Sequence, residues 1–215
     1  MPKLKKETRM FEFEVRAEEN QEYGKFITGT PIVYGQIIDM GEWRETIDPG
    51  ALDEKTDLKD VRFLIGHNMG MVPLARSRNN NANSTMQMII TDRGMGIRVN
   101  LDTENNVDSR TLYSATGRGD ISGMSFMFVV DKVVWEGLDT DSPLRRIKHI
   151  SKVFEVSAVA FPAYDGTDLQ TASADGAPEG ARSALESVKD ELREARDTFI
   201  KAKERREKAL EILRR

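Results

Sequence analysis

Apolar and charged residues alternate near the start of the chain, where Phe11, Phe13 and Val15 are separated by Glu12 and Glu14. A period of two is typical of a strand with one buried face, because successive side chains of a strand point to opposite sides. Further strands are predicted at 30–40, 61–67, 85–91, 96–102, 125–135 and 146–160. Many short strands at close spacing favour an α+β domain that is mainly β, and an antiparallel barrel would accommodate them.

Helical periodicity is found in two places. Asp108 is the predicted N-cap of a short helix at 109–116 that ends at Gly117. From residue 183 onward the apolar residues follow heptad spacing, and Glu, Lys and Arg cover the other faces, as in a coiled-coil seam. The apolar positions are Leu185, Val188, Leu192, Ala195, Phe199, Ala202, Ala209 and Leu213.

These patterns predict three parts. A folded domain is expected at 1–168, and a charged amphipathic helix at 183–215. The segment between them, 169–182, is rich in Ala, Gly, Ser, Asp and Pro, a composition typical of a flexible linker.

Composition and charge narrow the possible function classes. A formal net charge of −4 disfavours nucleic acid as a partner. The lack of cysteine excludes a thiol nucleophile, disulfides and thiolate metal sites. No apolar stretch approaches the roughly 20 residues of a membrane span, and no apolar segment follows the basic start as in a secretory signal. We expect a soluble, cytoplasmic protein that needs no cofactor, metal or membrane.

Ser125 is the first candidate for chemistry. It lies between the turn-permissive Gly123 and an apolar run, so it is placed at the mouth of a buried strand. The motif is not the G-x-S-x-G nucleophile elbow, because Met127 stands at the position of the second glycine. Taken alone, a serine at a strand start more often has a structural role.

Two further residues could complete a catalytic group. His67 ends the predicted strand 61–67, and the period of two places it on the face of Val61 and Phe63. Glu155 lies in an apolar strand, where a carboxylate needs a partner, either an arginine or an imidazole. A serine, a histidine and a carboxylate are the nucleophile, base and orienting group of a serine protease. The remaining histidine, His149, follows several basic residues and is expected to be solvated; two isolated histidines make a zinc site improbable.

Four motifs then occur in order along the chain. They are Gly35 with ETIDPGAL at 45–52, LIGHN at 64–68, GDISGMSFMF at 119–128 and FEVSAVAFPAY at 154–164. Over residues 24–168 the sequence thereby resembles the prohead (capsid-maturation) serine proteases of tailed bacteriophages, a family related in fold to the herpesvirus assembly proteases.

The resemblance implies an antiparallel β-barrel surrounded by helices, with Ser125 as catalytic serine and His67 as catalytic histidine. The phage motif supplies Glu155 as the third member, whereas the herpesvirus relatives use a second histidine, for which His149 is the alternative. Backbone N–H groups near 143–146 are a candidate oxyanion hole.

The resemblance also implies a place of action, inside the assembling procapsid in the host cytoplasm. The substrates would be an N-terminal extension of the major capsid protein or a separate scaffold, and the protease itself. The linker region 171–181 is a candidate self-processing site because it is predicted to be accessible.

Two other functions compete with this interpretation. A non-catalytic scaffolding protein would act through its C-terminal helix, which is also expected to mediate self-association. A generic serine esterase is disfavoured by the missing nucleophile elbow.

Overall fold

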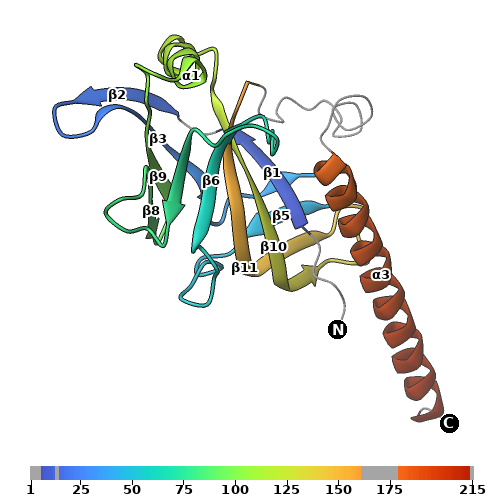
Figure 1. The fold of residues 1–215 in the computed structure, drawn as a ribbon. Helices are drawn as coiled ribbons and strands as arrows, with labels where there is room; N and C mark the ends of the chain where they lie inside the picture. The colour runs from blue at the N-terminus through green and yellow to red at the C-terminus, as the bar shows by residue number, and fades with distance from the viewer. Residues whose placement is uncertain (1–5, 13–14, 161–178, 214–215) are drawn as a thin grey trace.

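The computed structural model describes residues 6–12, 15–160 and 179–213, which form two sheets and two helices (Figure 1). The larger sheet has seven strands. They are β1 (Lys6–Glu12), β4 (Ile38–Asp39), β5 (Arg44–Ile47), β6 (Asp60–Ile65), β7 (Ala75–Arg78), β10 (Gly123–Glu136) and β11 (Leu144–Val159). The smaller sheet contains β2 (Arg16–Asn20), β3 (Gly24–Val33), β8 (Met86–Thr91) and β9 (Gly94–Asn100), in the order β2-β3-β9-β8.

The seven-stranded sheet is organised around β10 and β11. Its main path runs β1-β10-β11-β5-β4, while β6 pairs with the far end of β11 and with β7. The β1–β10 and β10–β11 pairs are antiparallel, but β5 and β6 both run parallel to β11. The mainly β class is confirmed. The predicted antiparallel barrel is not, because the described strands form a larger sheet of mixed direction and a smaller antiparallel sheet, and no closed barrel is seen among them.

The β10–β11 pair is long and irregular. Its register shifts at four places, the first between Met127 and Phe128. Such bulges bend a strand and increase its twist, which allows one end of β11 to pair with β5 and the other with β6. The apolar face of the pair packs into the core through Met124, Phe126 and Val156, all fully buried.

The predicted hairpin is confirmed, with β8 and β9 joined at Asp92 and Arg93. Gly94 follows the turn at a φ of 140°. A Cβ at this position would lie 1.9 Å from the carbonyl oxygen of Ile32 on β3, so only glycine lets the two strands approach this closely.

The short helix α1 (Val107–Arg118) is longer than predicted. Asn106, rather than Asp108, is its N-cap, because the Asn106 side chain accepts a hydrogen bond from the backbone N–H of Ser109. Asp108 lies in the first turn, where a negative charge favours the helix dipole. Gly119, rather than Gly117, ends the helix in the left-handed conformation.

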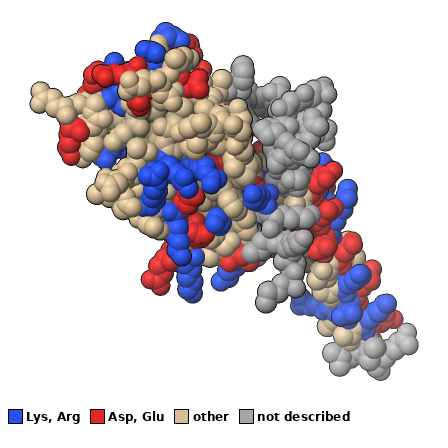
Figure 2. Space-filling view, viewed as in Figure 1, with Lys and Arg blue, Asp and Glu red and all other residues tan. Residues whose placement is uncertain are grey.

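The long helix α3 (Glu179–Leu213) begins four residues before the predicted boundary at 183. Its first half packs beside β1, where Val188 and Leu192 of the predicted stripe are buried. Every residue from 201 to 211 is exposed, and this end projects away from the sheets (Figure 1). Basic and acidic side chains are interspersed along the helix (Figure 2). Residues 169–178 of the predicted linker lie outside the described residues and 179–182 belong to α3, so the three-part division remains a prediction.

Candidate active site

His67 is placed by the turn that follows β6. The strand ends at Ile65, and both Gly66 and His67 then adopt positive φ angles, of 57° and 60°. A non-glycine residue in this region is uncommon and needs support from its surroundings. The backbone N–H of His67 provides it by donating to the hydroxyl of Ser157 at 3.1 Å. The prediction that strand alternation sets the direction of His67 is wrong, because the residue lies beyond the strand.

Ser125 and Glu155 reach the same side of the sheet through the register of β10 and β11. Ser125 lies directly opposite Ser157, and Glu155 lies two positions before Ser157. Directly opposed residues of an antiparallel pair share a face, as do residues two apart on one strand. The strand pairing alone therefore places the Ser125 hydroxyl and the Glu155 carboxylate on one face of the sheet.

The three predicted site residues form one continuous chain of polar contacts. His67 Nε2 lies 2.6 Å from Ser125 Oγ, and His67 Nδ1 lies 2.6 Å from Glu155 Oε1. Ser125 and Glu155 are fully buried and His67 is 7% exposed. With a proton on Nδ1 donated to Glu155, Nε2 can accept the proton of the Ser125 hydroxyl when that hydroxyl turns toward it. This is the arrangement needed for a histidine to remove the proton of a nucleophilic serine.

Ser157 is a fourth member of this group that the sequence analysis missed. Its hydroxyl donates to Glu155 Oε2 at 2.5 Å and accepts from the backbone N–H of His67. It therefore holds both the carboxylate and the turn that carries the imidazole. A signal was present in the sequence, because the Glu-x-Ser spacing puts the two side chains on one face of a strand.

The alternative third member, His149, lies elsewhere. Its ring nitrogens face the carboxylates of Asp131 and Asp53, and neither contacts His67. Burial alone would lower the pKa of His149, but hydrogen bonds to the two carboxylates outweigh it and raise the pKa above 6.5. His149 was expected to be solvated; its side chain is instead only 15% exposed and paired with acidic groups.

Strand β1 covers the candidate nucleophile. Met10 lies opposite Ser125 in the β1–β10 ladder, and the Ser125 hydroxyl donates to the carbonyl oxygen of Arg9 at 2.7 Å. The sequence analysis predicted a strand from Phe11 to Val15, which overlaps only the end of β1, and it gave no indication of the neighbouring strand. Nothing in an isolated strand specifies its partner.

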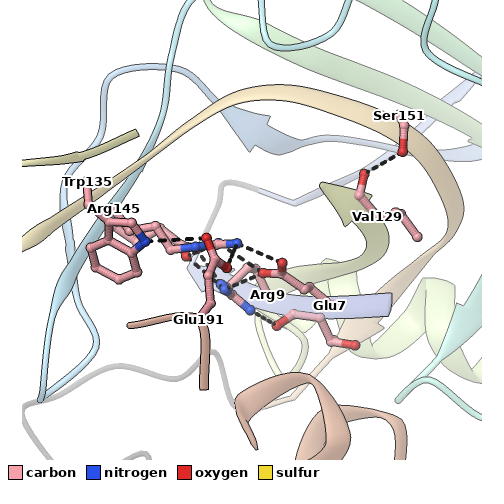
Figure 3. Close-up of polar contacts among 9 residues, drawn as sticks. Glu7, Arg9, Val129, Trp135, Arg145, Ser151 and Glu191 are labelled. Carbon is pink, nitrogen blue, oxygen red and sulfur yellow. Dashed lines mark hydrogen bonds and ion pairs between the residues drawn. The ribbon is translucent and has the colours of Figure 1, made fainter. Parts of the chain in front are cut away.

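Next to β1 lies a buried cluster of charges, which we call the Arg9–Arg145 cluster. It contains the buried Arg9, Arg145, Glu7 and Glu45 and the partly exposed Glu191 of α3 (Figure 3). Burial alone would raise the pKa of Glu45, but the charges of Arg9 and Arg145 lower it, to about 2.

Arg145 belongs to the segment suggested for the oxyanion hole. Its guanidinium donates to Glu7, Glu45 and Glu191, at 2.7 to 3.0 Å. The segment is the start of β11 rather than a loop. The oxyanion role of backbone groups at 143–146 remains a prediction.

Within the described residues, no group of three or more His, Cys, Asp or Glu side chains could hold a metal ion. The part of the chain seen in the structure also contains no helix that is long and apolar enough to cross a bilayer.

A mainly β fold that presents a Ser-His-Glu chain of contacts on adjoining strands has the features of a serine peptidase. Comparison with known families agrees: residues 11–180 match the caudovirus prohead serine proteases, and the chain belongs to this family. No curated protein and no solved structure matches the chain.

Proposed function

We propose that the protein is a serine endopeptidase of procapsid maturation in which Ser125 is the nucleophile, His67 the general base and Glu155 the orienting carboxylate. The observation that carries the proposal is the unbroken series of contacts from Ser125 through His67 to Glu155, at 2.6 Å each. Membership of the prohead protease family supports the reaction class.

The proposed reaction uses these residues in two half-reactions. Ser125 Oγ attacks the peptide carbonyl carbon while its proton passes to His67 Nε2. The C–N bond then breaks as His67 returns the proton to the departing amine, which leaves an acyl-enzyme. Water, deprotonated by His67, hydrolyses this ester and restores Ser125. Glu155 stabilises the imidazolium in both halves without taking its proton.

The proposed substrates are the scaffold region or N-terminal extension of the major capsid protein, and the protease chain itself. The place of action is the interior of the assembling procapsid. Residues 171–178 lie outside the described residues, and α3 begins at Glu179. A self-processing site at 171–181 is therefore proposed from the sequence alone.

An intact-mass time course tests the peptidase activity. Purified chain and a Ser125→Ala variant are incubated alone and with the capsid protein, and the products are identified by mass. We expect discrete fragments only with the wild-type chain. Fragments that also form with Ser125→Ala would overturn the assignment of the nucleophile. Cuts confined to the folded domain would exclude the self-processing site at 171–181.

The exposed half of α3 favours a second role, in scaffold docking or self-association. Val188 and Leu192 are buried against the domain, so only the later part of the apolar stripe, from Ala202 onward, is free for a partner. We propose that this half forms a helical pair with scaffold or with a second copy.

Sedimentation of the full chain tests the second-copy case. Ala202→Glu with Ala209→Glu should abolish concentration-dependent association, while Lys203→Glu with Lys208→Glu, off the stripe, should preserve it. Association equal in both variants would exclude the stripe as the interface.

A further inference from the structure

The strand that carries the candidate nucleophile is paired with a strand from the start of the same chain. β1 is the outermost strand beside β10, and without it β10 would be the edge of the sheet at Ser125. Ser125 has no exposed surface. A peptide substrate that pairs with β10 at Ser125 therefore needs the place that β1 occupies.

β1 also has the features expected of a peptide in that place. It is extended, pairs antiparallel with the strand that carries the nucleophile, and brings the carbonyl oxygen of Arg9 within 2.7 Å of Ser125 Oγ. Extended peptides bind exposed sheet edges by adding a strand, and the backbone bonds fix their register. Here the hydroxyl donates to the carbonyl oxygen, which is the arrangement of a bound strand rather than of an attack on the carbonyl carbon.

The side chain of the same residue enters a built site. Arg9 Nε and Nη2 donate to the two carboxylate oxygens of Glu45, a fork-to-fork pair that matches guanidinium geometry. Glu45 is 1% exposed and belongs to β5, so it stays in place if β1 leaves.

The pairing of Glu45 shows what would be missing without β1. Removal of Arg9 and Glu7 takes away one positive and one negative charge, so the net charge of the cluster does not change. Glu45, however, keeps only the guanidinium of Arg145 and loses the partner of its Oε1 oxygen. A peptide that takes the place of β1 would stabilise this buried carboxylate if it carried a cation at the position of Arg9.

We propose that peptide substrates bind as an added strand on β10 in the position held by β1, with a basic residue at the cleavage position whose side chain pairs with Glu45. In the free enzyme β1 fills this place as an internal substrate mimic. The inference rests on the proposed peptidase function and adds the class of substrate. Glu45 is its specificity-determining residue.

Substrate selection is tested with two fluorogenic peptides that differ only in arginine or citrulline at the cleavage position. Citrulline keeps the shape of arginine but carries no charge. The enzyme is the full chain with Arg9→Gln, which weakens the hold of β1, and Arg93→Gln, in the exposed turn before Gly94, is the matched control. We expect kcat/KM of the Arg9→Gln variant to be at least about 10-fold higher for the arginine peptide. The control should cleave both peptides more slowly than Arg9→Gln does.

The double variant Arg9→Gln with Glu45→Gln assigns the preference to Glu45. It removes one positive and one negative charge together, so the buried cluster keeps its balance, and a melting curve verifies folding. We expect the arginine preference to disappear. A preference that survives in this variant, or equal rates on both peptides with Arg9→Gln, would overturn the inference while the peptidase function stands.

Labelling by a fluorophosphonate probe separates the two proposals. If the probe labels Ser125 in the Arg9→Gln variant but neither peptide is cleaved, the proposed substrate class is overturned. Absence of both labelling and cleavage would overturn the peptidase function and this inference with it.

A cross-strand disulfide tests the position of β1 directly. The chain has no cysteine, and Lys6 lies opposite Val129 in the β1–β10 ladder, within disulfide range for paired antiparallel residues. In the Arg9→Gln background, Lys6→Cys with Val129→Cys should label at least about 10-fold more slowly when oxidised than when reduced. The Lys6→Cys single variant should be insensitive to oxidation. Equal rates for the two redox states of the double variant would show that β1 does not block the site.

Discussion

The backbone N–H of His67 donates to the hydroxyl of Ser157, which in turn donates to Glu155. One serine on β11 thus holds both the turn that carries the imidazole and the carboxylate that faces it. The strained, positive-φ backbone of His67 is held by this bond to a neighbouring strand.

Replacing Ser157 should therefore impair both stability and activity. Ser157→Ala leaves a buried N–H without its acceptor and removes one bond to Glu155, which costs about 1–3 kcal/mol of unfolding free energy. We expect kcat to fall while KM changes little. Urea unfolding and peptide kinetics measure the two effects. Ser151→Ala, also on β11, is the control, because its hydroxyl donates to Val129 away from the site (Figure 3). Equal kinetics in both variants would remove Ser157 from the positioning role.

Glu155→Gln should lower kcat far more than it changes substrate binding. A glutamine can present an N–H to His67 Nδ1, which favours the tautomer whose Nε2 carries a proton and cannot accept one from Ser125. In a Ser-His-Asp triad the equivalent change costs roughly 10⁴-fold in kcat. Single-turnover kinetics check the loss. A decrease below about 10-fold would show that Glu155 does not orient the base.

Glu45 should contribute to acid sensitivity. Its pKa is lowered from 4.5 to about 2 in the folded chain, so its contribution to stability is complete above pH 4.5 and is lost as the pH falls toward 2. We expect stability to decrease across this window, and the decrease to be smaller in the charge-balanced variant Arg9→Gln with Glu45→Gln. Thermal melts at a series of pH values compare the two. Parallel curves for both proteins would contradict the prediction.

His149 should act in the opposite sense. Its pKa is raised above 6.5 in the folded chain by Asp131 and Asp53, so its contribution is complete below pH 6.5 and is lost as the pH rises through the folded pKa. We expect His149→Gln to lose the part of the stability that decreases above pH 6.5, with peptide cleavage at pH 8 unchanged. Thermal melts between pH 5.5 and 8.5 test the first point. A loss of cleavage would instead return His149 to the candidate catalytic residues.

Strands β6, β8, β9, β10 and β11 could be predicted because alternation and apolar runs are local signals, whereas β2, β5 and β7 were not predicted. The hairpin of β8 and β9, and the long strands β10 and β11, follow from runs of β-favouring residues and from the turn at Asp92. The cap of α1 was less predictable, since Asn106 and Asp108 are both good cap residues and only the path of the chain selects one.

Only part of the candidate site could be predicted from the sequence. Ser125, His67 and Glu155 could be named individually, but their meeting depends on two independent pairings. These are the antiparallel register that sets Ser125 against Ser157 and the parallel register that sets β6 beside β11. Neither register can be derived from the strands alone, because each brings together residues far apart in the chain.

The amino-acid sequence by itself determined the strand-rich class, the long charged helix and the residue types available for chemistry, because these depend on local pattern and composition. Only the tertiary structure decided that β1 lies over Ser125 and that Glu45 receives the side chain of Arg9. The physical reason is that an edge strand can pair with any exposed edge. For β1, the place beside β10 is favoured by ion pairs with charged side chains on β5, β11 and α3, which become neighbours only when the sheets have formed.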